Sequence, residues 1–237
     1  MPPVLINLGL LIALGFAVVL LTRVVVRGIE LYAEAGGLSA KAKGQFLGYA
    51  TSLPELVGTV GTAGNGLLDA GLWNIGASNV INLGLFTLAA AYYGRLRVVA
   101  QKKFYDEIGF ALAAFAVPLA LARQDEAAES PYTAGGLFLF FLSYLYLDRK
   151  LNPSPPPSIQ AASSRRARAG DPNTKLRAIA LIVAGIAGII LAGNYLGEEA
   201  KAVVVDLGVP EWAVGWILGV ITSLPEMTAF FAVFATA

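Results

Sequence analysis

Seven long apolar segments constrain the fold of this chain more than any other feature of its sequence. They cover residues 4–22, 44–64, 70–91, 107–122, 132–147, 178–196 and 213–235. Most are close to the roughly 20 residues that a helix needs to cross the hydrocarbon core of a bilayer. The chain of 237 residues is 57% hydrophobic and only 14% charged, so it lacks the charged surface of a soluble domain. The sequence therefore predicts an all-α integral membrane protein.

Two residue types are missing, and their absence removes several kinds of chemistry. The chain has no cysteine and no histidine. Disulfides, thiolate and imidazole metal sites and Ser-His catalytic systems are therefore excluded. The net charge of +1 gives no general basic surface for nucleic acid, so no nucleic-acid partner is expected. Carboxylates, hydroxyls, amides and backbone groups remain for any function.

Basic residues gather in alternate loops, and this pattern predicts the orientation in the membrane. The loops after the first, third and fifth segments hold 15 of the 17 lysines and arginines. The last of these loops, residues 149–177, is rich in Pro, Ser and Arg and is typical of a linker. Because basic loops stay in the cytoplasm, we expect the 149–177 loop inside and the N-terminus outside.

An internal repeat relates the second apolar segment to the seventh. A shift of 171 residues aligns residues 37–56 with residues 208–227 without a gap. The aligned pairs include the glycines of two G-x-x-x-G faces, at 44 and 48 and at 215 and 219, which permit close helix contact. The two segments are five crossings apart, so they run in opposite directions. This is the inverted repeat of many secondary transporters, whose substrate sites lie between the repeats.

Each repeat places a carboxylate at membrane depth. Glu55 and Glu226 lie near the centres of their segments, where a charge costs a few kcal/mol and indicates function. The structural alternative is a protonated glutamate that donates a hydrogen bond to a neighbouring helix. Pro54 and Pro225 cannot donate to the carbonyls of Ala50 and Ile221, so each helix is expected to kink beside its glutamate.

The groups around these kinks predict a site for a hard cation. Thr51 and Ser52 precede the first kink, and Thr222 and Ser223 precede the second. Carboxylate, carbonyl and hydroxyl oxygens are the ligands that Ca²⁺ prefers, and Na⁺ accepts the same types. Ser78 and Asn82 share one helix face in the third segment, either as further site residues or as polar contacts between helices.

Two motifs resemble the α-repeat of the sodium/calcium exchanger family of the Ca²⁺/cation antiporters. That repeat reads G-T-S-L-P-E-L and, after a fixed gap, G-N-x-x-G-S-N-I-x-N. Here residues 50–56 read ATSLPEL, residues 74–82 read NIGASNVIN, and the second repeat opens with ITSLPEM at 221–227. Trp73 and Ala77 stand where the family pattern has glycine, which places bulkier residues where helices normally pack closely.

The resemblance implies a fold of ten helices in two inverted halves, which exchanges Ca²⁺ for Na⁺ by alternating access. Residues 1–148 would form the first half, with its repeat at about 44–91, and residues 178–237 would begin the second half after the 149–177 linker. The implied ligands are the carboxylates of Glu55 and Glu226, the backbone oxygens of Thr51 and Thr222, the hydroxyls of Ser52, Ser78 and Ser223, and the side chain of Asn82.

Several functions remain open at this point. The alternatives to Ca²⁺/Na⁺ exchange are a related Ca²⁺/H⁺ or other cation antiporter and a truncated, non-transporting membrane protein. No enzyme and no cofactor are expected, and the membrane is expected to be a prokaryotic plasma membrane. Residues 1–237 hold about seven of the ten expected helices. We therefore expect no exchange from the chain alone, unless a second copy or another chain supplies the remaining helices.

Overall fold

A computed structural model describes residues 3–36, 38, 40–101, 105–121, 130–151 and 172–236. Every regular element within these ranges is an α-helix. In chain order the helices are α1 (Pro3–Gly36), α2 (Ala40–Thr51), α3 (Leu53–Gly64), α4 (Leu68–Tyr92), α5 (Leu96–Val99), α6 (Tyr105–Leu121), α8 (Pro131–Leu151), α10 (Pro172–Leu207), α11 (Glu211–Thr222) and α12 (Leu224–Thr236). The predicted all-α class is confirmed.

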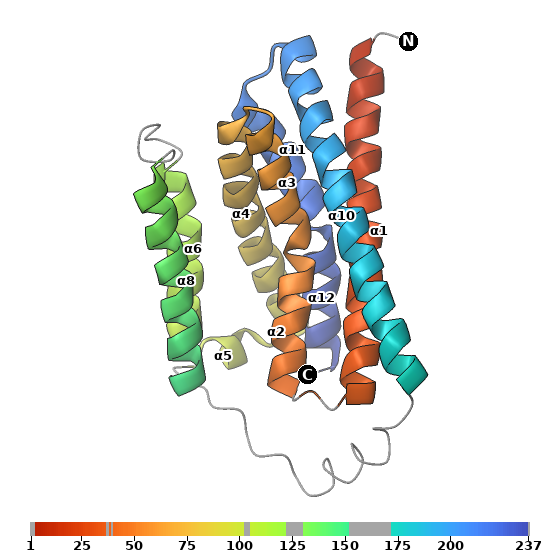
Figure 1. Ribbon diagram of the computed structural model, residues 1–237. Coiled ribbons are helices and arrows are strands. Elements are labelled where there is room, and N and C mark those ends of the chain that lie inside the picture. Colours follow the sequence, from red (N-terminus) through yellow and green to blue (C-terminus); the bar gives the residue numbers. More distant parts are fainter. Residues whose placement is uncertain are drawn as a thin grey trace, which may run out of the picture.

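The helices run up and down between two ends of the molecule (Figure 1). Four described stretches are long and apolar enough to cross a membrane on their own: Leu5–Ala35, Leu68–Tyr92, Asn173–Leu207 and Glu211–Ala235. The other predicted spans correspond to α2 followed by α3, to α6 and to α8. The start of α1 lies at one end, and the end of α8 and the start of α10 lie at the other (Figure 1). Of the predicted 149–177 linker, residues 152–171 lie outside the described residues.

The α1 and α10 helices extend well beyond the predicted segments 4–22 and 178–196. They have 34 and 36 residues, which at ~1.5 Å per residue exceeds the roughly 30 Å hydrocarbon core. The two helices pack along each other through glycines; a Cβ on Gly28 would lie 2.9 Å from the carbonyl oxygen of Ala178. This close packing explains why the helices continue after the apolar pattern ends.

Each repeat forms a helix that breaks near its middle, as the prolines predict. The breaks fall at Ser52, between α2 and α3, and at Ser223, between α11 and α12. The two serines share one backbone conformation, with φ −87° and ψ 1° at Ser52 and φ −81° and ψ −1° at Ser223. The α2–α3 pair and the α11–α12 pair run in opposite directions (Figure 1). The predicted inversion of the two motifs is therefore present.

The departures from glycine on α4 are compensated by glycines on α11. A Cβ on Gly215 would lie 2.6 Å from the Cβ of Trp73, and one on Gly219 would lie 2.7 Å from the Cβ of Ala77. The larger residues thus sit against glycine, and the helices still approach closely. The first G-x-x-x-G face differs from expectation, because nothing lies within 4 Å of a Cβ added to Gly44 or Gly48. Only the second face is used for close packing among the described residues.

Two apolar clusters enclose the breaks in the repeat helices. One cluster joins α1, α4, α10 and α11 around Leu11, Leu196 and Leu218. The other joins α1, α2 and α10 around Val25 and Ile189. The α6 and α8 helices form a pair at one side of the bundle (Figure 1). Their position leaves the α1–α4 and α10–α12 helices to build the interior in which the polar residues lie.

Candidate cation site

The predicted carboxylates are buried in equivalent positions of the two repeats. Glu55 lies in the first turn of α3 and is 8% exposed, and Glu226 lies in the first turn of α12 and is 5% exposed. The two side chains are close enough for their charges to interact. The break before each helix lets both carboxylates approach the same interior region from opposite directions.

Unpartnered oxygen atoms concentrate at this place. Within the described residues, seven buried side-chain nitrogen or oxygen atoms have no hydrogen-bond partner. Six of them belong to predicted site residues: both carboxylate oxygens of Glu55, both of Glu226, Oδ1 of Asn82 and Oγ of Ser223. A buried polar group without a partner is costly, so such groups are rare and call for a ligand. All six of these atoms are oxygens, which suits a hard cation.

Further polar side chains of both repeats surround the carboxylates. The Glu226 carboxylate lies close enough to Thr51 and Ser52 for an electrostatic interaction. The Glu55 carboxylate lies close enough to Asn82 of α4 for the same kind of interaction. These approaches do not meet the geometry of a hydrogen bond, because the carboxylate oxygens have no such partner. The carboxylate of the second repeat therefore faces hydroxyls of the first repeat, and the site is shared between the repeats.

The threonines at the two breaks make matching contacts. The hydroxyl of Thr51 donates to the carbonyl of Gly48 at 3.0 Å, and that of Thr222 donates to the carbonyl of Gly219 at 3.5 Å. Gly48 and Gly219 are themselves an aligned pair of the 171-residue repeat. Because these hydroxyls donate to backbone carbonyls, the threonine side chains help to stabilise the helix ends at the breaks.

The predicted serines and asparagine differ in their surroundings. Ser78 is buried on α4 and donates to the carbonyl of Ile75 at 3.1 Å. Ser223 is buried, whereas its counterpart Ser52 is exposed. Asn82 lies two turns beyond Asn74 on α4 and is half-buried. The structure thus brings Thr51, Ser52 and Asn82 toward the two carboxylates, whereas the Ser78 hydroxyl is bonded within α4.

Asn74 is a site-supporting residue that the sequence reasoning did not select. It is fully buried on α4, and its Nδ2 donates to the backbone carbonyl of Glu55 and to Oγ1 of Thr59, both at 3.1 Å. Its Oδ1 accepts a hydrogen bond from Thr222 at 3.3 Å. Asn74 therefore connects both repeats through one side chain. Its spacing of four from Ser78 and eight from Asn82 puts it on the same helix face, and this periodicity was the available signal.

A cavity of about 500 Å³ lies next to the two breaks and extends along α1. It lies between α1, α2 and α12, with Thr51 and Pro225 at the site. Arg23, Arg27 and Glu30 of α1 also line this cavity. Arg27 and Glu30 form an ion pair of 3.3 Å across one turn. The cavity thus ends beside the two breaks, and the buried carboxylates of Glu55 and Glu226 do not line it.

The donor groups of this arrangement are of the kind that suits reversible binding of a hard cation. No group of three or more acidic, His or Cys side chains that could hold a metal ion occurs in the described ranges. A cation here would thus depend on two carboxylates together with neutral oxygens. A third buried acid, Asp148, is different in kind, because Lys41 pairs with it at 2.8 Å and Gln45 donates to it at 3.2 Å. Asp148 fastens α8 to α2 and has no need of a further cation.

Comparison with known proteins agrees with these features. The family model described as "Sodium/calcium exchanger protein" matches residues 6–148, which is more than half of the chain. Searches of curated proteins and of solved structures gave no match. The matched range extends from the first turn of α1 through most of α8 and includes Glu55, Asn74 and Asn82. By this match, the chain belongs to the sodium/calcium exchanger protein family.

Proposed function

We propose that this integral membrane protein is a secondary active antiporter that exchanges Ca²⁺ for Na⁺ at the site between the two repeats. The observation that carries the proposal is the group of six unpartnered buried oxygens, contributed by α3, α4 and α12 and by the break at Ser223. Calcium takes six to eight oxygens in flexible geometry, and sodium accepts the same ligand types. Each proposed ligand is therefore a group that either ion can use.

Charge balance supports a divalent ion and its exchange for monovalent ions. Glu55 and Glu226 together supply two negative charges in a region of low dielectric, where repulsion between them is weakly screened. One Ca²⁺ neutralises both carboxylates, and so do two Na⁺ ions. Binding of either set relieves the cost of burying the charges, so the carboxylates favour an occupied site over an empty one.

The inverted helices and the cavity support alternating access. In inverted-repeat transporters, one part of the bundle moves against the other around a fixed site. Here the site lies at the breaks of two helices that run in opposite directions, and the cavity lined by Thr51 and Pro225 extends from beside the breaks toward the basic end. By the positive-inside rule this end is cytoplasmic, so the cavity lies on the cytoplasmic side of the breaks.

Competition between ions tests the proposal and separates it from its alternatives. Binding of ⁴⁵Ca²⁺ to the purified chain would be measured while Na⁺, K⁺ or pH is varied at constant ionic strength. The proposal predicts that Na⁺ displaces Ca²⁺ and that K⁺ at the same concentration does not. Displacement by protons without an effect of Na⁺ would support Ca²⁺/H⁺ exchange instead. Absence of Ca²⁺ binding would contradict both antiporter functions.

A further inference from the structure

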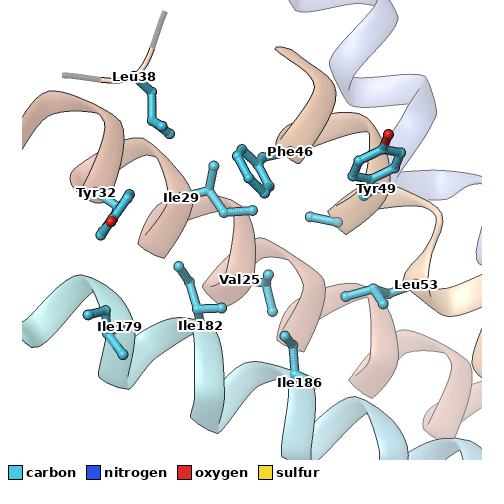
Figure 2. Close-up of a pocket in the computed structure, with 11 residues that line it drawn as sticks. Val25, Ile29, Tyr32, Leu38, Phe46, Tyr49, Leu53, Ile179, Ile182 and Ile186 are labelled. Atoms are coloured by element: carbon cyan, nitrogen blue, oxygen red, sulfur yellow. The ribbon is translucent and has the colours of Figure 1, made fainter. Parts of the chain in front are cut away.

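A second, apolar cavity lies between α1, α2 and α10, apart from the candidate cation site. Figure 2 shows its lining side chains converging from these helices. Its volume is about 460 Å³, within the range of small-molecule pockets. The lining residues are almost wholly apolar, and the tyrosine hydroxyls are the only polar side-chain groups among them. Such a lining cannot coordinate a cation, but it suits a hydrocarbon chain.

The cavity opens sideways from the bundle. Its floor is formed by the buried residues Val25, Ile29 and Ala50. Its rim includes Phe46 and Ile179, which are 49% and 46% exposed. Around an integral membrane protein, an opening in the side of the helix bundle faces lipid. The chemical class that reaches this cavity is therefore the bilayer lipid itself.

Two lysines lie next to the end of the cavity that is nearer to the basic loops. Lys175 precedes Ile179 by four residues on α10, and Lys43 precedes Phe46 by three residues on α2. Each lysine therefore shares a helix face with a residue of the cavity lining, one turn closer to the membrane surface. Tyr32 lines the same end and has the amphipathic character of an interfacial residue. A negatively charged headgroup placed there would meet two positive charges.

We infer that this cavity is a binding site for an anionic phospholipid. One acyl chain lies in the apolar cavity, and the phosphate group lies near Lys43 and Lys175. Lysines at a membrane surface each contribute about 1 kcal/mol of attraction to acidic lipids, which supplies the headgroup preference. A zwitterionic lipid could fill the same apolar volume but would gain no net attraction from the lysines.

The acyl chain of the bound lipid would reach the broken helix of the first repeat. The deep end of the cavity is lined by Ala50 and Leu53, which lie on either side of Thr51 and Ser52. An acyl chain there packs against the break between α2 and α3. The lipid therefore stabilises the position of α2, which has few close neighbours at Gly44 and Gly48.

Lipid retention by variants tests this inference independently of cation transport. The purified, delipidated chain would be titrated with dioleoylphosphatidylglycerol or dioleoylphosphatidylcholine, and bound lipid counted by native mass spectrometry. We expect one phosphatidylglycerol to be retained more tightly than phosphatidylcholine. Lys43→Gln and Lys175→Gln should each weaken retention about fivefold. Ile179→Trp, which enlarges the side chain at the cavity rim, should weaken retention of either lipid at this site.

Matched variants on α10 keep the test specific. Lys201→Gln removes one charge at the opposite end of the helix, and Ile190→Trp adds the same ring at a lipid-exposed position outside the cavity. Both should retain phosphatidylglycerol like the wild type. Equal retention of both lipids, or unchanged retention in the lysine variants, would overturn the inference. The lysine variants decide the outcome by themselves if Ile179→Trp does not fold.

Discussion

Replacing Asn74 by alanine removes a buried side chain that bonds to both repeats. The wild-type amide makes three hydrogen bonds, to Glu55, Thr59 and Thr222, at 3.1 to 3.3 Å. A hydrogen bond contributes about 0.5–1.5 kcal/mol net in water, and those between helices in membranes average about 0.6 kcal/mol. Three bonds, together with the volume lost from a fully buried position, predict a loss of about 2–4 kcal/mol in the free energy of unfolding.

Asn79 on the same helix provides a matched control for this substitution. Its Nδ2 makes one hydrogen bond, to the carbonyl of Ala114 on α6 at 3.0 Å, in a more exposed setting. Asn79→Ala should therefore cost only about 0.5–1 kcal/mol. Unfolding of each variant would be followed by tryptophan fluorescence in mixed micelles titrated with a denaturing detergent.

A double-mutant cycle isolates the contact between the repeats. Asn74→Ala and Thr222→Val remove the two partners of the 3.3 Å bond, singly and together. The cycle should give a coupling energy of roughly 0.6 kcal/mol, and no more than about 1.7 kcal/mol. A cost for Asn74→Ala no greater than that for Asn79→Ala, or a cycle without coupling, would refute the connecting role of Asn74.

Two further predictions concern packing and orientation. Gly219→Val should destabilise the chain by about 1–3 kcal/mol, because its side chain would enter α4, whereas Gly48→Val should be tolerated; equal unfolding free energies would contradict the assigned packing. A cysteine at Ser158 should resist an impermeant thiol reagent in intact cells while one at Ala127 reacts, and the reverse labelling would overturn the orientation.

The sequence predicts the parts of this structure that depend on local chemistry. Proline two residues after a serine, in a long apolar helix, predicts the breaks before Glu55 and Glu226, and both occur. A repeat of odd separation predicts the opposite directions of the two motifs (Figure 1). These features follow from backbone hydrogen bonding and chain crossing, so they need no knowledge of neighbours in space.

The features that the sequence did not predict depend on which surfaces meet. The pair Gly215 and Gly219 packs against α4, whereas the identical spacing at Gly44 and Gly48 has no close neighbour. Likewise, Asn74 is a connecting residue only because Thr222 comes within 3.3 Å of it. The apolar pattern also underestimates the lengths of α1 and α10. Both helices continue into charged residues, and glycines allow the two helices to pack closely.

Calcium binding by single-carboxylate variants tests the central claim most directly. Glu55→Gln and Glu226→Gln each remove one negative charge while keeping the side-chain shape, and Asp148→Asn removes the paired carboxylate that lies at the end of α8. Isothermal titration of the purified proteins should show that both glutamate variants lose Ca²⁺ binding, because one carboxylate leaves the ion's charge uncompensated at low dielectric. The Asp148→Asn protein should bind Ca²⁺ like the wild type. Wild-type affinity in either glutamate variant would contradict a shared cation site between the repeats.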